Sequence, residues 1–339
     1  MATTIHDVAA RAGVSTATVS RALRGFPNVS DGARARVQEA ARQLDYVVSV
    51  AASGLASGRT RTIAVAAPFV GRWFFGEVVD GIEDVLRTGD MDMLLYNVGD
   101  TRRRNRFFAD LPIRRRVDGL IVLSLPLSSD ELAALRPLPV PVVLVGLRAD
   151  GFSSVRIDDV AAAVTATQHL INLGHVRIAL LSDSRYETIP FKNTAERRWG
   201  YRTALLNAGL TPEPALEVSG PFGVDGGSGA MADLLGAPSP PTAVFAEFDE
   251  MAYGAIRTLR RMRMRIPEDM SVIGVDDHEL SELMDLTTVR QPVREQGSQA
   301  ARLLLQLLDQ PQQQAEEIVL PTQLVVRGTT SICRGAGNR

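Results

Sequence analysis

One stretch near the N-terminus, TIHDVAARAGVSTATVSRALR from Thr4 to Arg24, constrains the fold of this chain more than any other. Thr4 and Asp7 have the spacing of a capping box, in which the acidic side chain reaches back to the free amides of a helix's first turn. Gly13 permits the left-handed backbone that ends this helix and turns the chain sharply. Ser15 can cap a second helix. The stretch therefore predicts two short helices joined by a tight turn.

The second predicted helix has the side chains of a surface that reads DNA. Val19 and Leu23 face inward at helical spacing, whereas small and polar side chains face outward near its N-terminal half, the part of a recognition helix that meets base edges. A short helical pair with a glycine turn can also be plain scaffold. In the DNA-reading interpretation, the contacting residues are Thr4, Ser15, Thr16, Ala17, Ser20 and Arg21.

The distribution of charge agrees with a DNA-binding head. Residues 1–60 hold seven arginines and four carboxylates, a net charge of +3, and the remainder of the chain carries −5. The electrostatic affinity for phosphates therefore belongs to the N-terminal part alone.

The order of motifs extends well beyond the first two helices. TxxDVAxxAGVSxxTVSRxL is followed by Val29-Ser30, an arginine-rich third helix, Leu44-x-Tyr46 and Ala52-x-x-Leu55-x-x-Gly58-Arg59-Thr60. This series closely resembles the lactose/galactose repressor family of bacterial transcriptional regulators, over essentially the whole chain. The resemblance implies a sequence-specific DNA-binding repressor, acting as a homodimer on a near-palindromic operator and controlled by a small-molecule effector.

The segment after the third helix reads as a linker, because it is rich in alanine, serine, glycine and valine. The resemblance implies that it forms a hinge helix on DNA, with Leu55 wedged into the minor groove. The chain departs from the family pattern at Val48-Ser49, which replaces a Pro-Asn start. Gly54 inside the hinge costs ~1 kcal/mol relative to alanine. We therefore expect a hinge more flexible than usual.

From Thr62 onward, short β-rich runs alternate with amphipathic helices in two successive series. This alternation predicts an α/β core of two lobes, each a doubly wound parallel sheet with right-handed crossovers. The family resemblance implies a core like that of periplasmic binding proteins, behind the all-α helix-turn-helix head. The expected domains are a head at 1–46, a hinge or linker at 47–60 and a core at 61–339, with lobe 1 at about 61–158 and 290–321 and lobe 2 at about 159–289 and 322–333.

Ligands of open α/β sheets collect at the carboxyl ends of strands, so two lobes would place their ligand in one cleft. The family resemblance implies effector contacts from the paired aromatics, from the arginine of an Arg-x-x-Gly-aromatic pattern and from residues that follow later strands. The expected ligand-binding residues are Phe74, Phe75, Arg197, Phe222, Asp249 and Asp276. Core packing is the alternative for the paired aromatics, helix capping for Asp249, and support of the hinge between lobes for Asp276.

The chemical character of these side chains indicates the class of effector. Phe74 and Phe222 can stack on apolar faces, while Arg197 and Asp249 form a paired donor and acceptor for hydroxyl groups. A neutral carbohydrate is therefore favoured. A purine or nucleoside could use the same four residues and remains the alternative.

Other classes of protein find little support. The four histidines form no HExxH pattern, Cys333 is the only cysteine, and no Walker A loop occurs, so we expect neither an enzyme, nor a metal, nor a cofactor. A secretory leader and an apolar run of about 18 residues are both missing, so we expect a cytoplasmic protein without a membrane anchor rather than an exported solute-binding protein. The C-terminal CRGAGNR lacks apolar heptads, so we expect a dimer and no tetramer.

Overall fold

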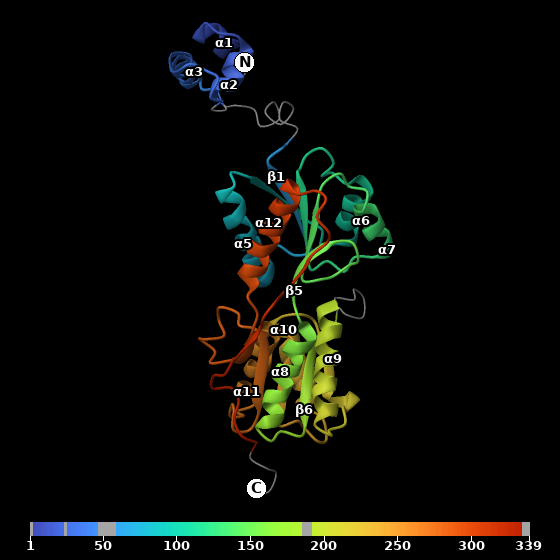
Figure 1. Ribbon diagram of the computed structural model, residues 1–339. Helices are drawn as coiled ribbons and strands as arrows, with labels where there is room; N and C mark the ends of the chain where they lie inside the picture. The colour runs from blue at the N-terminus through green and yellow to red at the C-terminus, as the bar shows by residue number, and fades with distance from the viewer. Residues whose placement is uncertain (1–2, 24–25, 47–58, 185–191, 334–339) are drawn as a thin grey trace. The chain divides into compact units, whose positions relative to one another are not determined.

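The computed structural model describes residues 3–23, 26–46, 59–184 and 192–333 (Figure 1). Contacts between residues divide the chain into two units, Met1–Arg61 and Thr62–Arg339. The predicted hinge residue Leu55 and most of the linker lie outside the described residues.

The first unit is a bundle of three helices, α1 Ile5–Ala12, α2 Thr16–Leu23 and α3 Asp31–Gln43. The carboxylate of Asp7 accepts hydrogen bonds from the Thr4 amide at 2.8 Å and from the Thr4 hydroxyl at 2.7 Å. Gly13 ends α1 with φ 66° and ψ 37°. Ser15 Oγ accepts from the amide of Thr18 at 3.2 Å. The predicted start, turn and second start are thus confirmed.

Each helix of the first unit supplies side chains to a common core. Val8, Val19 and Val37 are fully buried at its centre, one from each helix. Arg34 of α3 donates to the carbonyl oxygens of Ala22 and Phe26, which fixes the end of α2 against α3. The three-helix head predicted from the sequence is therefore a folded unit with its own interior.

The first lobe of the second unit is built on a six-stranded sheet, sheet A, in the order β11-β5-β4-β3-β1-β2. All its strand pairs are parallel. The strands are β1 Thr62–Ala67, β2 Asp92–Asn97, β3 Gly119–Leu123, β4 Val142–Val145, β5 Ser153–Ile157 and β11 Glu317–Leu320. Its helices are α5 Trp73–Thr88, α6 Thr101–Asp110, α7 Ser129–Leu135 and α12 Val293–Asp309.

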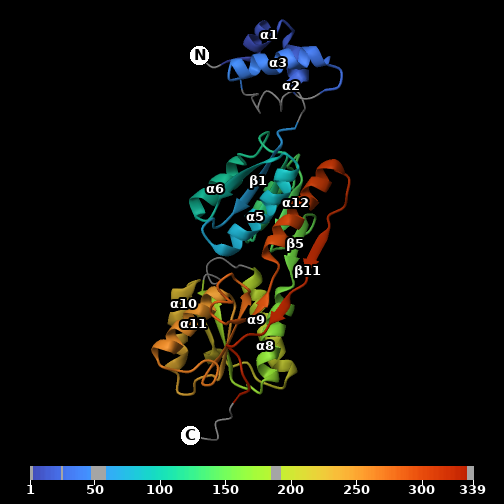
Figure 2. The ribbon, with the colours of Figure 1, turned by 90° about the vertical axis from the view of Figure 1, so that its left-hand side faces the viewer.

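Helices cover both faces of sheet A, as Figure 2 shows for α5, α6 and α12. On β1, Ile63 and Val65 pack with α5 and α12, while Ala64 and Ala66 pack with α6 and α7. Successive residues of a strand point to opposite faces, so a strand buried on both sides is a continuous apolar run.

The second lobe repeats this plan on sheet B, in the order β12-β10-β9-β8-β6-β7. The strands are β6 Ile178–Asp183, β7 Glu217–Gly220, β8 Ala243–Ala246, β9 Ser271–Asp276, β10 Thr287–Arg290 and β12 Gln323–Val325. The edge strand β12 runs antiparallel to β10, and the other pairs are parallel. Helices α8 and α9 cover one face and α10 and α11 the other. These helices are α8 Asp159–Asn172, α9 Lys192–Asn207, α10 Val224–Leu235 and α11 Asp249–Arg261, with a 3₁₀ turn at Pro214–Leu216.

The predicted fold class is confirmed: two doubly wound, mainly parallel sheets follow an all-α head. The chain passes between the lobes after β5, after β10 and after β11, because α8, α12 and β12 belong to the lobe opposite the strand that precedes them. Within the described ranges, no helix is long and apolar enough to cross a membrane.

Candidate functional site

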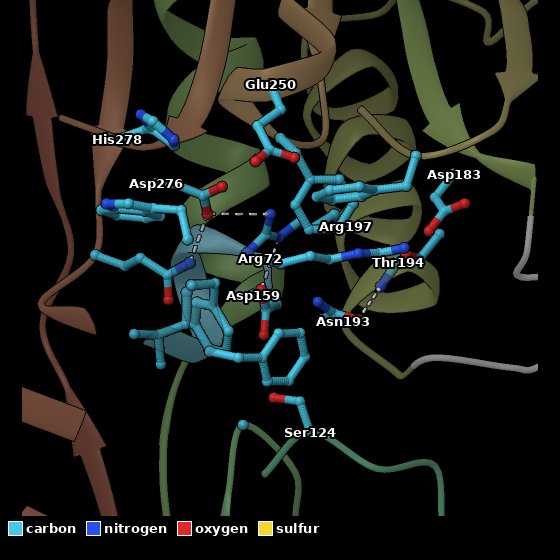
Figure 3. A pocket seen from close by; sticks show the side chains of 18 of the residues that line it. Arg72, Ser124, Asp159, Asp183, Asn193, Thr194, Arg197, Glu250, Asp276 and His278 are labelled. Carbon is cyan, nitrogen blue, oxygen red and sulfur yellow. Dashed lines mark hydrogen bonds and ion pairs between the residues drawn. The ribbon is translucent and has the colours of Figure 1, made fainter. Parts of the chain in front are cut away.

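A cavity lies where the two lobes of the second unit face each other (Figure 3), and the space between its lining residues, open solvent included, is about 760 Å³. Its lining comes from the carboxyl ends of strands in both sheets, with Ser124 after β3 and Gly146 after β4 in lobe 1, and Asp183 at the end of β6 and Asp276 at the end of β9 in lobe 2. An open cavity thus lies at the place where a ligand site is expected between two facing parallel sheets.

Aromatic side chains form two walls of the cavity, one on each lobe. Phe74 and Phe75, from the first turn of α5, have ring centroids 5.2 Å apart at an interplanar angle of 88°. Phe222 and Phe248 of lobe 2 have centroids 5.1 Å apart. Phe75 is 7% exposed, packs into the core of lobe 1 and also lines the cavity.

Arg197 lines the cavity, but much of its hydrogen-bonding capacity is used within the protein. Its Nε donates to Asp159 Oδ1 at 2.7 Å, and its Nη1 donates to the carbonyl oxygen of Glu247 and lies 3.8 Å from Asp276 Oδ1. The side chain is 1% exposed. A buried guanidinium needs such partners, because an unpaired charge in the interior is costly. Fewer N–H groups of the Arg197 guanidinium are therefore left to bind a ligand than the sequence pattern suggests.

Asp276 lies on the cavity surface at the end of β9. Its Oδ1 accepts from Gln291 Nε2 at 2.6 Å, and Gln296 in turn donates to Gln291. Burial raises the pKa of Asp276 well above its ordinary value, an effect that Arg197 opposes. The carboxyl group therefore faces the cavity from a hydrogen-bonded position.

Asp249, which the sequence predicted as a ligand contact, is not among the residues that line the cavity. It is fully buried, and its carboxylate accepts from the hydroxyls of Ser281 and Thr288, both at 2.6 Å, and from the His278 amide at 3.0 Å. Phe248 is the N-cap of α11, so Asp249 does not cap the helix either. Burial raises its pKa to about 6, although the three donors act against this rise. The side chain turns into the lobe, while Glu250 lines the cavity.

Several lining residues were not among the predicted ones, including Arg72, Trp73 and His278. The Trp73 and His278 rings are in contact across the two lobes, with centroids 4.6 Å apart and planes tilted by 35°. His278 Nδ1 accepts from the Leu280 amide at 3.0 Å, and burial lowers the histidine pKa, so the ring is neutral. Arg72 and Trp73 directly precede the aromatic pair in the sequence. This position was the feature from which both could have been predicted as lining residues.

Acidic groups outnumber basic groups around the cavity. Asp159, Asp183, Glu250 and Asp276 line it together with Arg72 and Arg197. Figure 3 shows these side chains converging from several elements. A phosphate or other anion would meet an excess of carboxylates, which disfavours it. The arrangement can bind a flat ring between aromatic walls and hydrogen-bond its polar edge. Among the described residues, no group of histidine, cysteine and acidic side chains is placed to hold a metal ion.

The first unit presents the predicted DNA-contacting residues around α2. Thr4, Ser15, Ala17 and Arg21 are exposed, and Thr16 and Ser20 are half-buried. The side chain of Arg21 forms no hydrogen bond or ion pair with the described part of the chain. In contrast, Arg36 donates to the Ala12 carbonyl and Arg42 pairs with Glu39. Arg21 is thus exposed and, unlike Arg36 and Arg42, is not held by the described residues of the head itself.

Comparisons with known proteins agree with both parts of this description. The family model described as bacterial regulatory proteins, lacI family, matches residues 4–49, and a periplasmic binding protein-like domain matches residues 167–330. The ribose operon repressor of Escherichia coli (strain K12) is 36% identical over 332 residues, covering 96% of this chain and 99% of the relative. The chain belongs to the lacI family of bacterial regulatory proteins. The predicted resemblance is confirmed, and this lacI-family protein is a DNA-binding regulator of transcription.

Solved structures of lacI-family regulators extend this similarity to the whole fold. The transcriptional regulator CelR in complex with cellobiose is 33% identical with a TM-score of 0.72, covering 96% of this chain and 99% of that chain. The lac repressor dimer bound to operator and an anti-inducer is 27% identical with a TM-score of 0.86, covering 98% and 100%. All three proteins are described as regulators or repressors.

Proposed function

We propose that this lacI-family regulator is a repressor whose affinity for operator DNA is controlled by a neutral carbohydrate bound in the cavity between its lobes. The observation that carries the proposal is a cavity with aromatic walls on both lobes and a carboxylate-rich polar lining. The complex of the relative CelR with cellobiose supports a sugar ligand. Because coupling is reciprocal, an effector that weakens operator binding must bind the DNA-free form more tightly by the same factor.

The polar lining suits hydroxyl groups at the edge of a ring. Asp276 can accept, Arg197 can donate, and Asn193 offers an amide that does both. Asp276 thus takes the acceptor role first expected of Asp249. A purine or nucleoside remains the second candidate, because the phenylalanine walls would stack on a base as well as on a sugar.

We propose that the protein acts as a homodimer on a near-palindromic operator, and the lac repressor relative, which binds operator as a dimer, supports this. Exposed apolar side chains on lobe 2 support a partner surface: Leu283 is 81% exposed, and Val224, Met262 and Leu280 are also exposed. Light scattering should give a mass close to twice the 36.7 kDa of one chain. A stable tetramer without DNA would contradict the proposal.

The remaining expectations form part of the same proposal. The head is residues 1–46, the linker 47–60 and the core 61–339, with lobe 1 at about 61–158 and 290–321 and lobe 2 at about 159–289 and 322–333. The membership of strands in sheets A and B supports these limits. The cavity serves binding rather than catalysis, and a protein that binds operator DNA works in the cytoplasm.

A ligand screen with matched variants tests the proposal. Sugars, sugar phosphates and nucleosides are compared by thermal shift on the wild type, on Asp276→Asn and on Asp233→Asn, an exposed control in the same lobe. A neutral sugar should stabilise the wild type and Asp233→Asn but not Asp276→Asn, and it should change operator binding. Equal stabilisation of all three proteins would place the ligand elsewhere. A response to nucleosides alone would select the second candidate.

A further inference from the structure

The cavity contains a side chain in the position expected of a ligand. Figure 3 shows Arg72 lying across the middle of the cavity. Its guanidinium carbon is 3.7 Å from the centroid of the Phe69 ring and 4.3 Å from the centroid of the Phe222 ring. Phe69 follows β1 in lobe 1 and Phe222 follows β7 in lobe 2. A residue of one lobe therefore contacts an aromatic ring of each lobe.

The chemistry of this contact resembles that of a bound planar ligand. A guanidinium is flat and weakly hydrated, and it is attracted to an aromatic face within about 6 Å of the ring centroid. The carboxylates of Asp183 and Glu250 line the same cavity and favour a positive charge inside it. Arg197 does not occupy this position, because it is held by Asp159 and by the carbonyl of Glu247.

We propose that the Arg72 guanidinium is a built-in occupant of a ring-binding subsite formed by Phe69 and Phe222, and that an effector ring must displace it. This inference rests on the proposed function, since it concerns the same cavity. Arg72 is then a specificity-determining residue. An effector ring binds only if its contacts with the subsite are more favourable than the contacts of the Arg72 guanidinium that it displaces. In the absence of effector, Arg72 and the ring contact between Trp73 and His278 hold the two lobes together.

The best variant to empty the subsite is Arg72→Ser. Arg72 is the N-cap of α5, and its side chain makes no capping hydrogen bond. Serine is among the preferred N-cap residues, so the variant should keep the start of α5 and fold. Arg72→Ala provides a second variant without the hydroxyl group. Arg103→Ala removes an exposed arginine from α6 of the same lobe and is the matched control.

The probe is methylguanidinium chloride, which carries the planar cation without the rest of the side chain. At about 10 mM it should raise the melting temperature of full-length Arg72→Ser by about 1–3 °C relative to the same concentration of sodium chloride. The wild type and Arg103→Ala should not respond, because their subsite is filled. Methylammonium, which lacks the planar group, should have little effect on any of them. The inference would be overturned if methylguanidinium raised the melting temperature of the wild type as much as that of both Arg72 variants. It would also be overturned if neither variant responded.

Tryptophan fluorescence provides a second measurement. The chain has two tryptophans, Trp73 beside the subsite and the exposed Trp199, so the Trp199→Phe background isolates Trp73. Methylguanidinium should change the emission of Trp73 in Arg72→Ser and leave it unchanged with Arg72 in place. This result does not depend on the effector: the proposed function fails separately, if no sugar or nucleoside alters operator binding by the wild type.

Discussion

The environment of Glu247 departs far from that of an ordinary glutamate side chain. It is fully buried just after β8, where its Oε2 accepts from the Asp183 amide at 3.3 Å. Its Oε1 has no hydrogen-bond partner in the part of the chain that the structure describes. Burial raises the pKa of Glu247 to about 8. The carboxyl group is therefore protonated near neutral pH, and its hydrogen-bond donor Asp183 is a residue of the cavity lining.

The raised pKa predicts how stability changes with pH. Between the unfolded value of about 4.3 and the folded value, the folded protein holds a proton that the unfolded chain has lost, so stability falls as pH rises. Glu247→Gln keeps the shape and cannot ionise. At pH 8 the variant should exceed the wild type in stability by about 1–3 kcal/mol, with a smaller difference at pH 5. Thermal unfolding at both pH values measures this, with the exposed Glu268→Gln as control. Parallel pH profiles of variant and wild type would disprove it.

At the scale of elements, α2 carries the interaction with DNA, and Arg21 is its exposed basic residue without a described partner. Arg21→Ala should cost about 1–3 kcal/mol per half-site if the side chain contacts a base edge, and the loss should depend on sequence. Fluorescence anisotropy on DNA selected from a random library measures the effect. Arg42→Ala, which removes an arginine already paired with Glu39, should cost less. A uniform loss with a shallower salt dependence would mean a phosphate contact instead.

The packing of α5 against α12 depends on two glycines. A Cβ at Gly81 would lie 2.0 Å from the Arg294 carbonyl oxygen, and one at Gly297 would lie 2.0 Å from the Val78 carbonyl oxygen. Both neighbours are backbone atoms, so the helices would have to separate. Because α5 carries the aromatic wall of lobe 1, their spacing also positions the cavity.

The glycine contacts predict opposite effects of one substitution at two positions of the same helix. Gly81→Ala should destabilise the protein by about 2–4 kcal/mol, because the added methyl group would meet backbone atoms, which cannot move aside as a flexible side chain can. Gly76→Ala meets nothing within 4 Å and should be neutral or stabilising by up to about 1 kcal/mol, because alanine is the better helix former. Melting temperatures decide the matter. Equal effects of the two substitutions would show that α5 and α12 do not need this close approach.

For the whole molecule, the two units separate the two binding activities. Removing residues 1–60 should abolish operator binding and leave the thermal stabilisation by effector unchanged, because each described residue of the cavity lining belongs to the second unit. Gel retardation and thermal shift on the truncated and full-length chains measure both activities. If the truncated core still bound operator, the assignment of DNA binding to the head would be wrong.

The features of the fold that the sequence by itself determined are local ones, because they depend on residues that are close in the chain. The cap at Ser15, the turn at Gly13 and the alternation of apolar runs with amphipathic helices are each fixed by near neighbours. The strands Ser153–Ile157 and Thr287–Arg290 are not apolar runs of this kind. Both are short and carry polar residues, and they are buried because distant helices pack on them, α12 on β5 and α8 on β10.

The details of the site were decided by the tertiary structure. The sequence shows that Asp249 follows a strand, but whether its side chain turns toward the cavity depends on donors 29 to 39 residues away. The same holds for Arg197, whose partner Asp159 is 38 residues distant, and for Arg72, which reaches a ring of the other lobe. A buried charge or donor takes whichever partner the fold brings within hydrogen-bond distance. The sequence by itself therefore determined the class of protein and the edge of the sheets where ligand binds, and only the packing of distant elements decided which side chains remain free to touch it.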